Sequence, residues 1–232
     1  MTTEEIFQRT ALLAGDDAMR RLADARVLLF GVGGVGSWCA EALIRSGVGH
    51  LTMVDPDLVD VSNINRQLPA TVATVGRPKV EVMRERFMDI NPTADIVARQ
   101  ERFTADTAPL FRVEEFDYVI DAIDSLQDKL ELILLATARR PDGDGRFFSS
   151  MGAARKSDPL QVKVSEFWKV DGCPLAASLR KRMRRQQRFP QGKFRCVWSP
   201  ERMEAAQPKG TLMPVTAAFG LVLASMVVRD IL

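Results

Sequence analysis

A strand, a glycine-rich turn, a helix and a second strand follow one another between residues 26 and 55. Arg26–Phe30 is short and apolar, as expected of a buried strand. It leads into Gly31-Val-Gly-Gly-Val-Gly36, and Ser37–Arg45 then has helical apolar spacing that stops at Ser46-Gly47. A second strand is predicted at His50–Asp55. This order predicts a βαβ unit, in which the two strands lie parallel in one sheet.

The periodicity of the remaining chain extends this pattern. We expect further helices at about residues 77–90, 125–139 and 212–228, and further strands at 94–99, 116–121 and 146–151. Leu160, Val162 and Val164 alternate with polar residues, as in a half-exposed strand. The predicted fold class is therefore α/β, a Rossmann-like, mostly parallel sheet with flanking helices.

The C-terminal segment 212–228 is almost entirely apolar. It contains Pro214, Thr216, Gly220 and Ser225, and it is shorter than the ~20 residues that a membrane span requires. We therefore expect a buried C-terminal helix and no membrane span. Because the chain shows no internal repeat and no low-complexity linker, residues 1–232 are expected to form a single domain.

Cysteine and histidine usage excludes several kinds of site. Cys39, Cys173 and Cys196 are widely spaced and form no C-x-x-C pair, which excludes a disulfide framework and the common four-cysteine zinc site. A single histidine, His50, excludes histidine-based metal clusters. Residues 1–8 are polar and lack the apolar core of a signal peptide, so we expect a protein of the reducing cytoplasm.

Positive charge is concentrated in one segment. The chain has a net charge of +2, but residues 172–200 contain no acidic residue and eight cations, which leaves the remainder at −6. The cations are Arg180, Lys181, Arg182, Arg184, Arg185, Arg188, Lys193 and Arg195. Such a segment can be a solvated helix face. Because the rest of the molecule is acidic, we favour binding of a polyanion, with interleaved Phe189, Phe194 and Trp198 available to stack on bases.

The glycine-rich turn points to a nucleotide. In a G-x-G-x-x-G turn between a strand and a helix, the backbone N–H groups can approach a phosphate closely. Gly31, Gly33 and Gly36 fit this pattern. Asp55 follows at the end of the second strand, where it can accept hydrogen bonds from ribose hydroxyls.

The loop after Asp55 favours a triphosphate over a dinucleotide. This loop is rich in polar side chains, and Lys79 opens the next helix; the polar residues are Asp57, Asp60, Ser62, Asn63, Asn65, Arg66 and Gln67. An arginine and a lysine directed at one ligand suit the higher charge of a triphosphate.

Two carboxylates follow the strand predicted at 116–121. Asp121 and Asp124 lie at the sheet edge where open α/β sheets bind ligands, and a carboxylate there can hold Mg²⁺ against phosphate oxygens. For Asp121, strand-end capping and a metal role remain equal alternatives, whereas for Asp124 we favour the metal role.

These motifs together resemble the adenylation core of the family that contains ThiF, MoeB and the ubiquitin-activating enzymes. The resemblance covers Gln8 to about Gly152 and rests on Gly31-Val-Gly-Gly-Val-Gly36, Asp55, Ser62-Asn-Ile-Asn-Arg-Gln67, Lys79 and Asp121-Ala-Ile-Asp124. It implies the adenylation fold of that family, with a nucleotide-binding core at about 26–154, a basic substrate-binding excursion at about 155–208 and a C-terminal return at 209–232.

The resemblance also implies a reaction and its residues. In this family a carboxylate attacks the α-phosphate of Mg-ATP and forms an acyl-adenylate and pyrophosphate. Carried over by position, the catalytic residues are Arg9, Arg66, Lys79 and Asp124, with Asp124 also the Mg²⁺ ligand. Arg9 stands where family members supply an arginine to the other subunit of a homodimer. The implied ATP-binding residues are Gly31, Gly33, Gly34, Gly36, Asp55, Asp57, Asn63, Arg66, Gln67, Lys79, Asp124 and Ser125.

Within the family the chain is most similar to the tRNA threonylcarbamoyladenosine dehydratase branch. The similarity rests on Gly-Val-Gly-Ser-Trp38, Ser149-Ser-Met-Gly-Ala153 and Cys173-Pro-Leu-Ala176 before the basic helix. It implies ATP-dependent cyclisation of threonylcarbamoyladenosine in tRNA, with sulfur-transfer proteins as possible partners. The implied tRNA-binding residues are Arg180, Lys181, Arg182, Arg184, Arg185 and Arg188.

The sequence is less consistent with three other functions. An adenylyltransferase for a sulfur-carrier or ubiquitin-like protein uses the same core, but such enzymes commonly carry paired C-x-x-C zinc ligands, which are absent here. An NAD-dependent oxidoreductase leaves Arg66 and Lys79 unexplained. A non-catalytic nucleotide- or RNA-binding scaffold does not need Arg66, Lys79 and Asp124 together, because it does not stabilise a leaving pyrophosphate. A nucleophilic role for Cys173 is disfavoured because no histidine accompanies it.

Overall fold

The computed structural model describes residues 2–138, 146–202 and 210–232, and its strands form one mixed sheet. The strands are β1 (Arg26–Phe30), β2 (His50–Val54), β3 (Asp95–Arg99), β4 (Tyr118–Asp121), β5 (Phe147–Ser150), β6 (Lys163–Glu166) and β7 (Arg195–Trp198). Their order in the seven-stranded sheet is β3-β2-β1-β4-β5-β7-β6, and every pair is parallel except β6 with β7. The predicted α/β fold with a mostly parallel sheet is confirmed.

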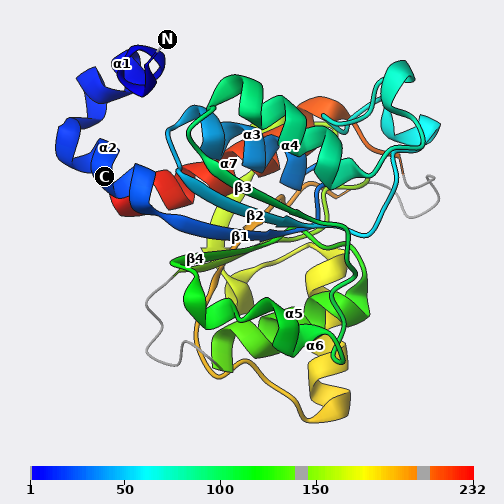
Figure 1. Cartoon of the computed structure of the whole chain (residues 1–232). Coiled ribbons are helices and arrows are strands. Elements are labelled where there is room, and N and C mark those ends of the chain that lie inside the picture. Colours follow the sequence, from blue (N-terminus) through cyan, green and yellow to red (C-terminus); the bar gives the residue numbers. More distant parts are fainter. Residues whose placement is uncertain (1, 139–145, 203–209) are drawn as a thin grey trace.

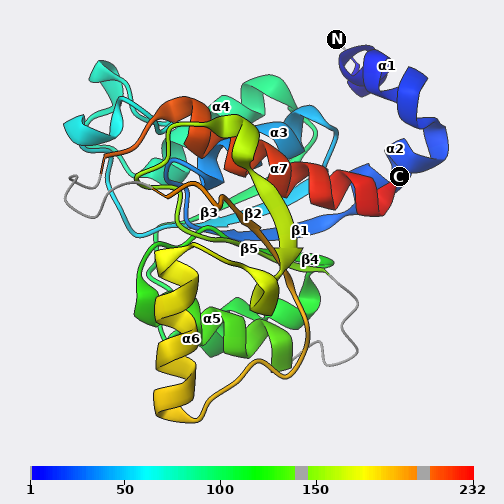
Figure 2. The ribbon, with the colours of Figure 1, turned by 180° about the vertical axis from the view of Figure 1, so that it is seen from behind.

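Helices cover both faces of the sheet (Figures 1 and 2). The helices are α1 (Thr3–Ala14), α2 (Asp16–Asp24), α3 (Gly36–Arg45), α4 (Lys79–Ile90), α5 (Leu126–Ala138), α6 (Pro174–Gln186) and α7 (Met213–Ile231). One apolar core joins α3, α4 and α7 to the face of the sheet that carries Val27 and Leu29. A second core joins α5 and α6 to the face that carries Leu28 and Phe30. Side chains alternate between faces along β1, as a strand buried on both sides requires.

The chain reverses its direction of strand addition next to β1. From β1 the chain adds β2 and β3 on one side and then returns to place β4 on the other side. Open α/β sheets bind ligands at such a switch point, beyond the carboxyl ends of the strands. Here those ends are the turn after Phe30 and the segment after Asp121, which are held together by a hydrogen bond from the Ala122 N–H to the Phe30 carbonyl (2.8 Å).

The apolar C-terminal segment forms α7, which packs against α3 in the core. Among the described residues, this helix of 19 residues is the one that is long and apolar enough to cross a membrane. Buried residues make up 56% of its apolar window, as in the core helix of a globular protein. Its buried side chains include Val215, Phe219 and Leu223, whose positions follow helical spacing. The predicted buried C-terminal helix is confirmed.

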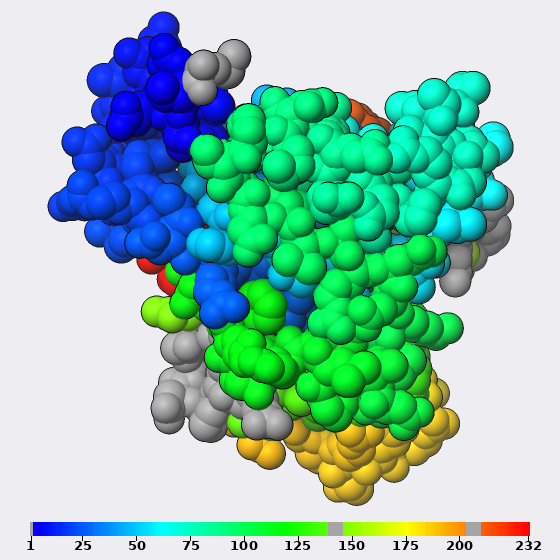
Figure 3. Space-filling model, viewed as in Figure 1, coloured from blue at the N-terminus to red at the C-terminus, as the bar shows by residue number. Residues whose placement is uncertain are grey.

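Three parts of the fold differ from the sequence-based expectation, and one is β7, where no strand was predicted. Leu160 lies in a short 3₁₀ helix, Pro159–Gln161, and is 92% exposed, so β6 begins later than the alternation suggests. The alternating apolar residues were therefore a poor guide to the start of that strand. The N-terminal helices α1 and α2 were not predicted, and Figures 1 and 3 show them standing out from one side of the molecule.

Candidate active site

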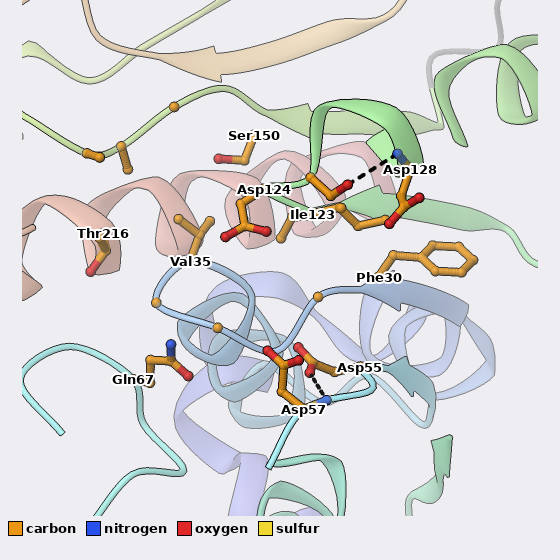
Figure 4. Close-up of a pocket in the computed structure, with 18 of the residues that line it drawn as sticks. Phe30, Val35, Asp55, Asp57, Gln67, Ile123, Asp124, Asp128, Ser150 and Thr216 are labelled. Atoms are coloured by element: carbon orange, nitrogen blue, oxygen red, sulfur yellow. Dashed lines mark hydrogen bonds between the residues drawn. The ribbon is translucent and has the colours of Figure 1, made fainter. Parts of the chain in front are cut away.

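A cavity of about 1040 Å³ opens at the switch point between β1 and β4. Its walls come from the turn after β1, the loop after β2, the start of α4, the segments after β4 and β5, and the first turns of α6 and α7. In the close-up, Asp55 and Asp57 lie on one wall and Ser150 on the opposite one (Figure 4). A cavity of this size lies at the upper end of small-molecule sites and has room for a nucleotide and part of a second ligand.

The glycine turn at the base of the cavity is fixed by close backbone contacts. Gly31 has φ +89°, a backbone conformation that favours glycine. A Cβ atom on Gly36 would lie 1.8 Å from the Gly31 carbonyl oxygen, so only glycine fits there. No side chain caps the N-terminus of α3, which begins at Gly36. The Ser37 N–H of the first turn donates to the Gly33 carbonyl (3.0 Å), and the positive end of the helix dipole still favours an anion here.

Asp55 is held rigidly at the end of β2. One carboxylate oxygen accepts from the Val32 N–H (2.6 Å) and the other from the Asp57 N–H (2.9 Å). Burial raises the pKa of Asp55 above its ordinary value, and the Lys79 ammonium and these two N–H groups oppose that rise. Each carboxylate oxygen has further lone pairs, so Asp55 can still accept hydrogen bonds from ribose hydroxyls.

Lys79 occupies the start of α4 at the edge of the cavity. Its side chain is 6% exposed, and its Nζ lies 2.7 Å from Asp57 Oδ2. The preceding residue, Pro78, provides no side-chain cap for α4. The helix N-terminus and the ammonium group thus present positive charge to the same side of the cavity.

The loop between β2 and α4 is tied to the glycine turn through α3. Trp38 Nε1 donates to the Arg66 carbonyl (3.1 Å). Arg66 Nη1 donates to the Ser62 carbonyl and to Asn65 Oδ1 (both 2.8 Å). Gln67 is 8% exposed, and its Oε1 is buried with no hydrogen-bond partner among the described residues. An unpaired buried acceptor on a cavity wall is suited to a ligand that donates a hydrogen bond.

The two carboxylates after β4 have different environments. Asp121 is fully buried; its Oδ2 lies 2.7 Å from Lys129 Nζ and accepts from Ser149 Oγ (2.6 Å). Its Oδ1 accepts from the Ile123 N–H (3.0 Å), so Asp121 caps the end of β4 and is unavailable to a ligand. Asp124 is exposed and points into the cavity (Figure 4).

The residues at this position fit Mg²⁺ bound together with a nucleotide. Within the described residues, no three His, Cys, Asp or Glu side chains form a ready metal site. Mg²⁺ usually keeps several waters and uses one or two carboxylates together with substrate phosphates. Asp124 is a carboxylate of this kind, whereas Asp57 is already paired with Lys79.

Comparison with known proteins identifies the family. The sequence matches the ThiF family over residues 7–232. The chain belongs to the ThiF family. The fold described above is therefore the adenylation fold of this family, as the sequence resemblance implied.

Curated relatives within the family carry a common name. The tRNA threonylcarbamoyladenosine dehydratase of Bacillus subtilis is 41% identical over 180 residues, which cover 78% of this chain and 69% of the relative. The enzyme of the same name from Escherichia coli is 35% identical and covers 97% of this chain and 93% of the relative.

Solved structures of the Escherichia coli enzyme, TcdA, have the same fold as this chain. A crystal structure in complex with AMP superposes with a TM-score of 0.91 at 37% identity and covers 98% of this chain and 94% of that chain. A second crystal structure contains ATP. By contrast, the molybdopterin-synthase adenylyltransferase of Salmonella typhimurium is 38% identical but covers 54% of this chain and 51% of that protein.

Most of the predicted nucleotide-binding residues of this ThiF-family chain line one cavity. The lining residues among them are Gly31, Gly33, Gly34, Asp55, Asp57, Asn63, Arg66, Gln67, Lys79, Asp124 and Ser125. Gly36 lies behind the turn at the start of α3. Their roles toward ATP remain a prediction.

Several lining residues were not found from the sequence. Arg102 and Asp128 form an ion pair (2.9 Å) at the cavity wall, and the segment Ser150–Arg155 crosses the cavity opposite Asp55. Thr211 and Thr216 reach the cavity from the start of α7. Residues 150–153 belong to a motif of the sequence resemblance, but their place in the cavity was not predicted. No local motif marks the other residues, because they meet only after the sheet has assembled.

Arg9 lies outside the cavity of its own chain. It is exposed on α1, whose Phe7 is buried and lies against Gly47 in the turn before β2. Figure 1 shows α1 at the edge of the molecule, away from the segments that form the cavity. A role for Arg9 in catalysis therefore requires a second subunit.

The predicted tRNA-binding cations differ in how they are used. Lys181, Arg184 and Arg185 are exposed on α6. Arg180 donates to the carbonyls of Phe167 (3.3 Å) and Val170 (2.9 Å) and so holds the loop before α6. The remaining two are Arg182, whose Nε is buried without a partner, and Arg188, which pairs with both carboxylate oxygens of Glu131 (2.7 Å each).

The expectation of base-stacking aromatics was wrong for two of three residues. Phe194 is 2% exposed and Trp198 is 8% exposed, because both pack in the core around α6. Phe189 is 44% exposed, and its ring centroid lies 6.5 Å from that of Trp168, which is also exposed. All three cysteines are buried, which agrees with the disfavoured nucleophilic role of Cys173.

Proposed function

We propose that this chain is an ATP-dependent tRNA threonylcarbamoyladenosine dehydratase that closes a ring on its substrate through an acyl-adenylate. One observation carries the proposal: α6 begins at the wall of the nucleotide-type cavity, with Pro174, Leu175 and Ser178, and continues into exposed Lys181, Arg184 and Arg185. A continuous surface thus joins the cavity to a cationic helix, as an enzyme that modifies a nucleotide within a polyanion requires.

The cavity residues would act by binding and by stabilising charge. The carboxylate of the threonylcarbamoyl group attacks the α-phosphate of ATP, which forms the acyl-adenylate and releases pyrophosphate. The glycine turn, Arg66 and Lys79 would bind the phosphates, and Asp55 the ribose. Mg²⁺ held by Asp124 would supply further charge neutralisation when bound. Fixed cations stabilise the charge that develops on phosphate oxygens without a general base.

The second step needs little further help from the protein. A nitrogen of the same threonylcarbamoyl group attacks the activated carbonyl, AMP leaves, and the net change in the substrate is the loss of one water. An intramolecular attack has a high effective concentration, so positioning suffices. His50 takes no part, because it lies beside Asp95 at the amino end of β2, outside the cavity at the carboxyl ends of the strands.

Nucleoside mass spectrometry tests this function directly. The wild-type protein is incubated with threonylcarbamoyladenosine-containing tRNA, with and without Mg-ATP. We expect an ATP-dependent loss of one water from the modified adenosine. No change, together with ATP–pyrophosphate exchange that appears only with a small Gly-Gly-ended carrier protein, would instead assign the chain as a carrier-protein adenylyltransferase.

Removal of charge from α6 should weaken tRNA binding. In the triple variant Lys181→Gln, Arg184→Gln and Arg185→Gln, we expect a lower affinity for tRNA and a flatter salt dependence, because fewer counterions are released on binding. Filter binding over a range of salt concentrations measures both. The control is a triple Gln variant of Arg20, Arg84 and Arg112, which removes the same charge from cations engaged in surface ion pairs. Equal loss in the two variants would show that net charge alone governs binding.

We further propose a homodimer in which Arg9 of one subunit completes the site of the other. Arg9→Ala and Asp124→Asn variants should each be inactive alone. In mixed dimers, the site of the Arg9→Ala chain keeps Asp124 and receives Arg9 from its partner. Random mixing should therefore restore about a quarter of wild-type activity. If co-expressed variants remain as inactive as the separate ones, Arg9 does not act across a subunit boundary.

Three wider expectations accompany this proposal. The chain is expected to act in the cytoplasm, where its tRNA substrate is modified. Residues 1–232 are expected to form one domain with the core, basic segment and return given above. Sulfur-transfer proteins stay possible partners; the three buried cysteines give no exposed acceptor thiol in the described residues.

A further inference from the structure

Arg155 is a cavity-lining cation with no acidic partner. The residue lines the cavity, and its Nε is buried without a hydrogen-bond partner. Within residues 2–138, 146–202 and 210–232, its guanidinium forms no ion pair. The adjacent Lys156 contrasts with it, because that ammonium is buried and donates to the carbonyls of Ser199 and Glu201. Lys156 therefore stabilises the fold, whereas Arg155 is left for a ligand.

The backbone holds Arg155 in an unusual conformation. Its φ is +58°, a region that residues other than glycine rarely adopt. Its N–H donates to the Gly210 carbonyl (2.9 Å), at the segment that leads into α7. Strained conformations of this kind persist where surrounding contacts enforce them and are frequent at ligand sites. The backbone of Arg155 at the cavity wall is therefore fixed.

Arg155 is connected to the loop that carries Arg66. Gly210, which accepts from Arg155, precedes Thr211, whose carbonyl accepts from Asn65 Nδ2 (3.2 Å). Asn65 in turn contacts Arg66 through its Oδ1 (2.8 Å). The segment Gly210–Thr211 thus lies between Arg155 and the predicted triphosphate-binding loop. Arg155 and the first turn of α6 line the same cavity.

The proposed reaction brings two anions together, the substrate carboxylate and the triphosphate. The substrate carboxylate must approach the α-phosphate of a triphosphate, and repulsion between the two opposes this approach. In the function proposed above, Lys79 and Arg66 bind the phosphates. A further cation is needed to hold the carboxylate, and a guanidinium can bind it through two parallel hydrogen bonds.

We propose that Arg155 binds the carboxylate of the threonylcarbamoyl group and positions it against the α-phosphate. The proposal rests on the function proposed above and names the residue that recognises the reacting group. It makes Arg155 a substrate-specificity residue, because unmodified tRNA has no such carboxylate at the reacting adenosine.

Steady-state kinetics of Arg155 variants test this assignment. Arg155→Asn removes the guanidinium but tolerates the positive φ, and Arg155→Gly relieves it. For both we expect kcat/KM for modified tRNA to fall about 10- to 100-fold, as for the loss of charge-assisted hydrogen bonds. The KM for ATP and the affinity for unmodified tRNA should remain at wild-type values. Arg155→Lys should recover part of the loss. The control Arg202→Gln removes an exposed cation that pairs with Asp171 and should behave as wild type.

Each alternative role has its own result. A rise in the KM for ATP would show that Arg155 binds the triphosphate. An equal loss of affinity for unmodified tRNA would show a contact with the tRNA backbone, and unchanged kinetics would show no ligand contact at all. Any of these results overturns the assignment. These results can be distinguished from failure of the proposed function itself. In that case the wild-type protein would remove no water from modified tRNA.

Discussion

Replacement of Asp124 by Asn should abolish ATP–pyrophosphate exchange in the presence of modified tRNA. Asp124 is exposed into the cavity, whereas Asp121 is buried by Lys129 and Ser149, so Asp124 is the carboxylate after β4 that can reach a metal. The amide keeps the size of the side chain but removes its charge. Loss of one group that stabilises transition-state charge costs about 100- to 1000-fold in rate, and we expect a loss of this size.

The control separates charge at this position from charge in general. Asp106→Asn makes the same chemical change at an exposed residue outside the cavity and should leave exchange unchanged. Binding of tRNA should be nearly the same in both variants, because α6 is untouched. Exchange at the wild-type rate in Asp124→Asn would remove the Mg²⁺ role from this residue.

The fold was largely predictable because its strongest signals are local. The run Arg26–Phe30, the glycine turn and the helix after it appear in the structure within a residue of the predicted bounds. Each of these elements has a periodic apolar face and a defined stop. Helices α1 and α2 give a weaker signal, since α1 buries only Phe7, and α2 is short and buries only Ala18 and Leu22. The strand β7 is short and lies within the basic segment.

In the candidate site, too, the parts that are continuous in sequence were predicted and the parts that come from separate elements were not. Its glycine turn and the loop carrying Arg66 are continuous in sequence and were found. Arg155 is held by Gly210 before α7, and the pair Arg102–Asp128 joins the segment after β3 to α5, so their positions depend on how distant elements pack. Composition also misled for Phe194 and Trp198, because an aromatic residue between arginines can belong to either the surface or the core. Only the packing of these two residues in the core that includes α6 decides between them.

The choice between capping and metal binding for Asp121 likewise needed the fold. Lys129 is eight residues away in sequence and, as a lysine in a helix, would ordinarily be exposed. In the structure α5 directs it beneath the sheet end, where its side chain and that of Asp121 are both 0% exposed. A buried ion pair is visible only in three dimensions.

This buried pair supports the last prediction, that Lys129→Met should strongly destabilise the protein. The variant leaves the Asp121 carboxylate without its counterion in the core. Removal of one partner of a buried ion pair costs about 3–5 kcal/mol of unfolding free energy, which is a large part of the stability of an ordinary domain. Urea denaturation followed by circular dichroism measures the change. As a control, Arg20→Met breaks the exposed pair with Asp17 and should have no measurable effect.

A double variant tests whether the cost comes from the uncompensated charge. Asp121→Asn with Lys129→Met removes both charges, while the Asn side chain can still accept from the Ile123 N–H and donate to Ser149 Oγ. We expect it to recover most of the lost stability. Equal destabilisation of the single and double variants would instead assign the loss to packing around Lys129. Asp121 precedes Asp124 by three residues at the end of β4. We therefore expect Lys129→Met also to lower ATP–pyrophosphate exchange at urea concentrations too low to unfold the protein.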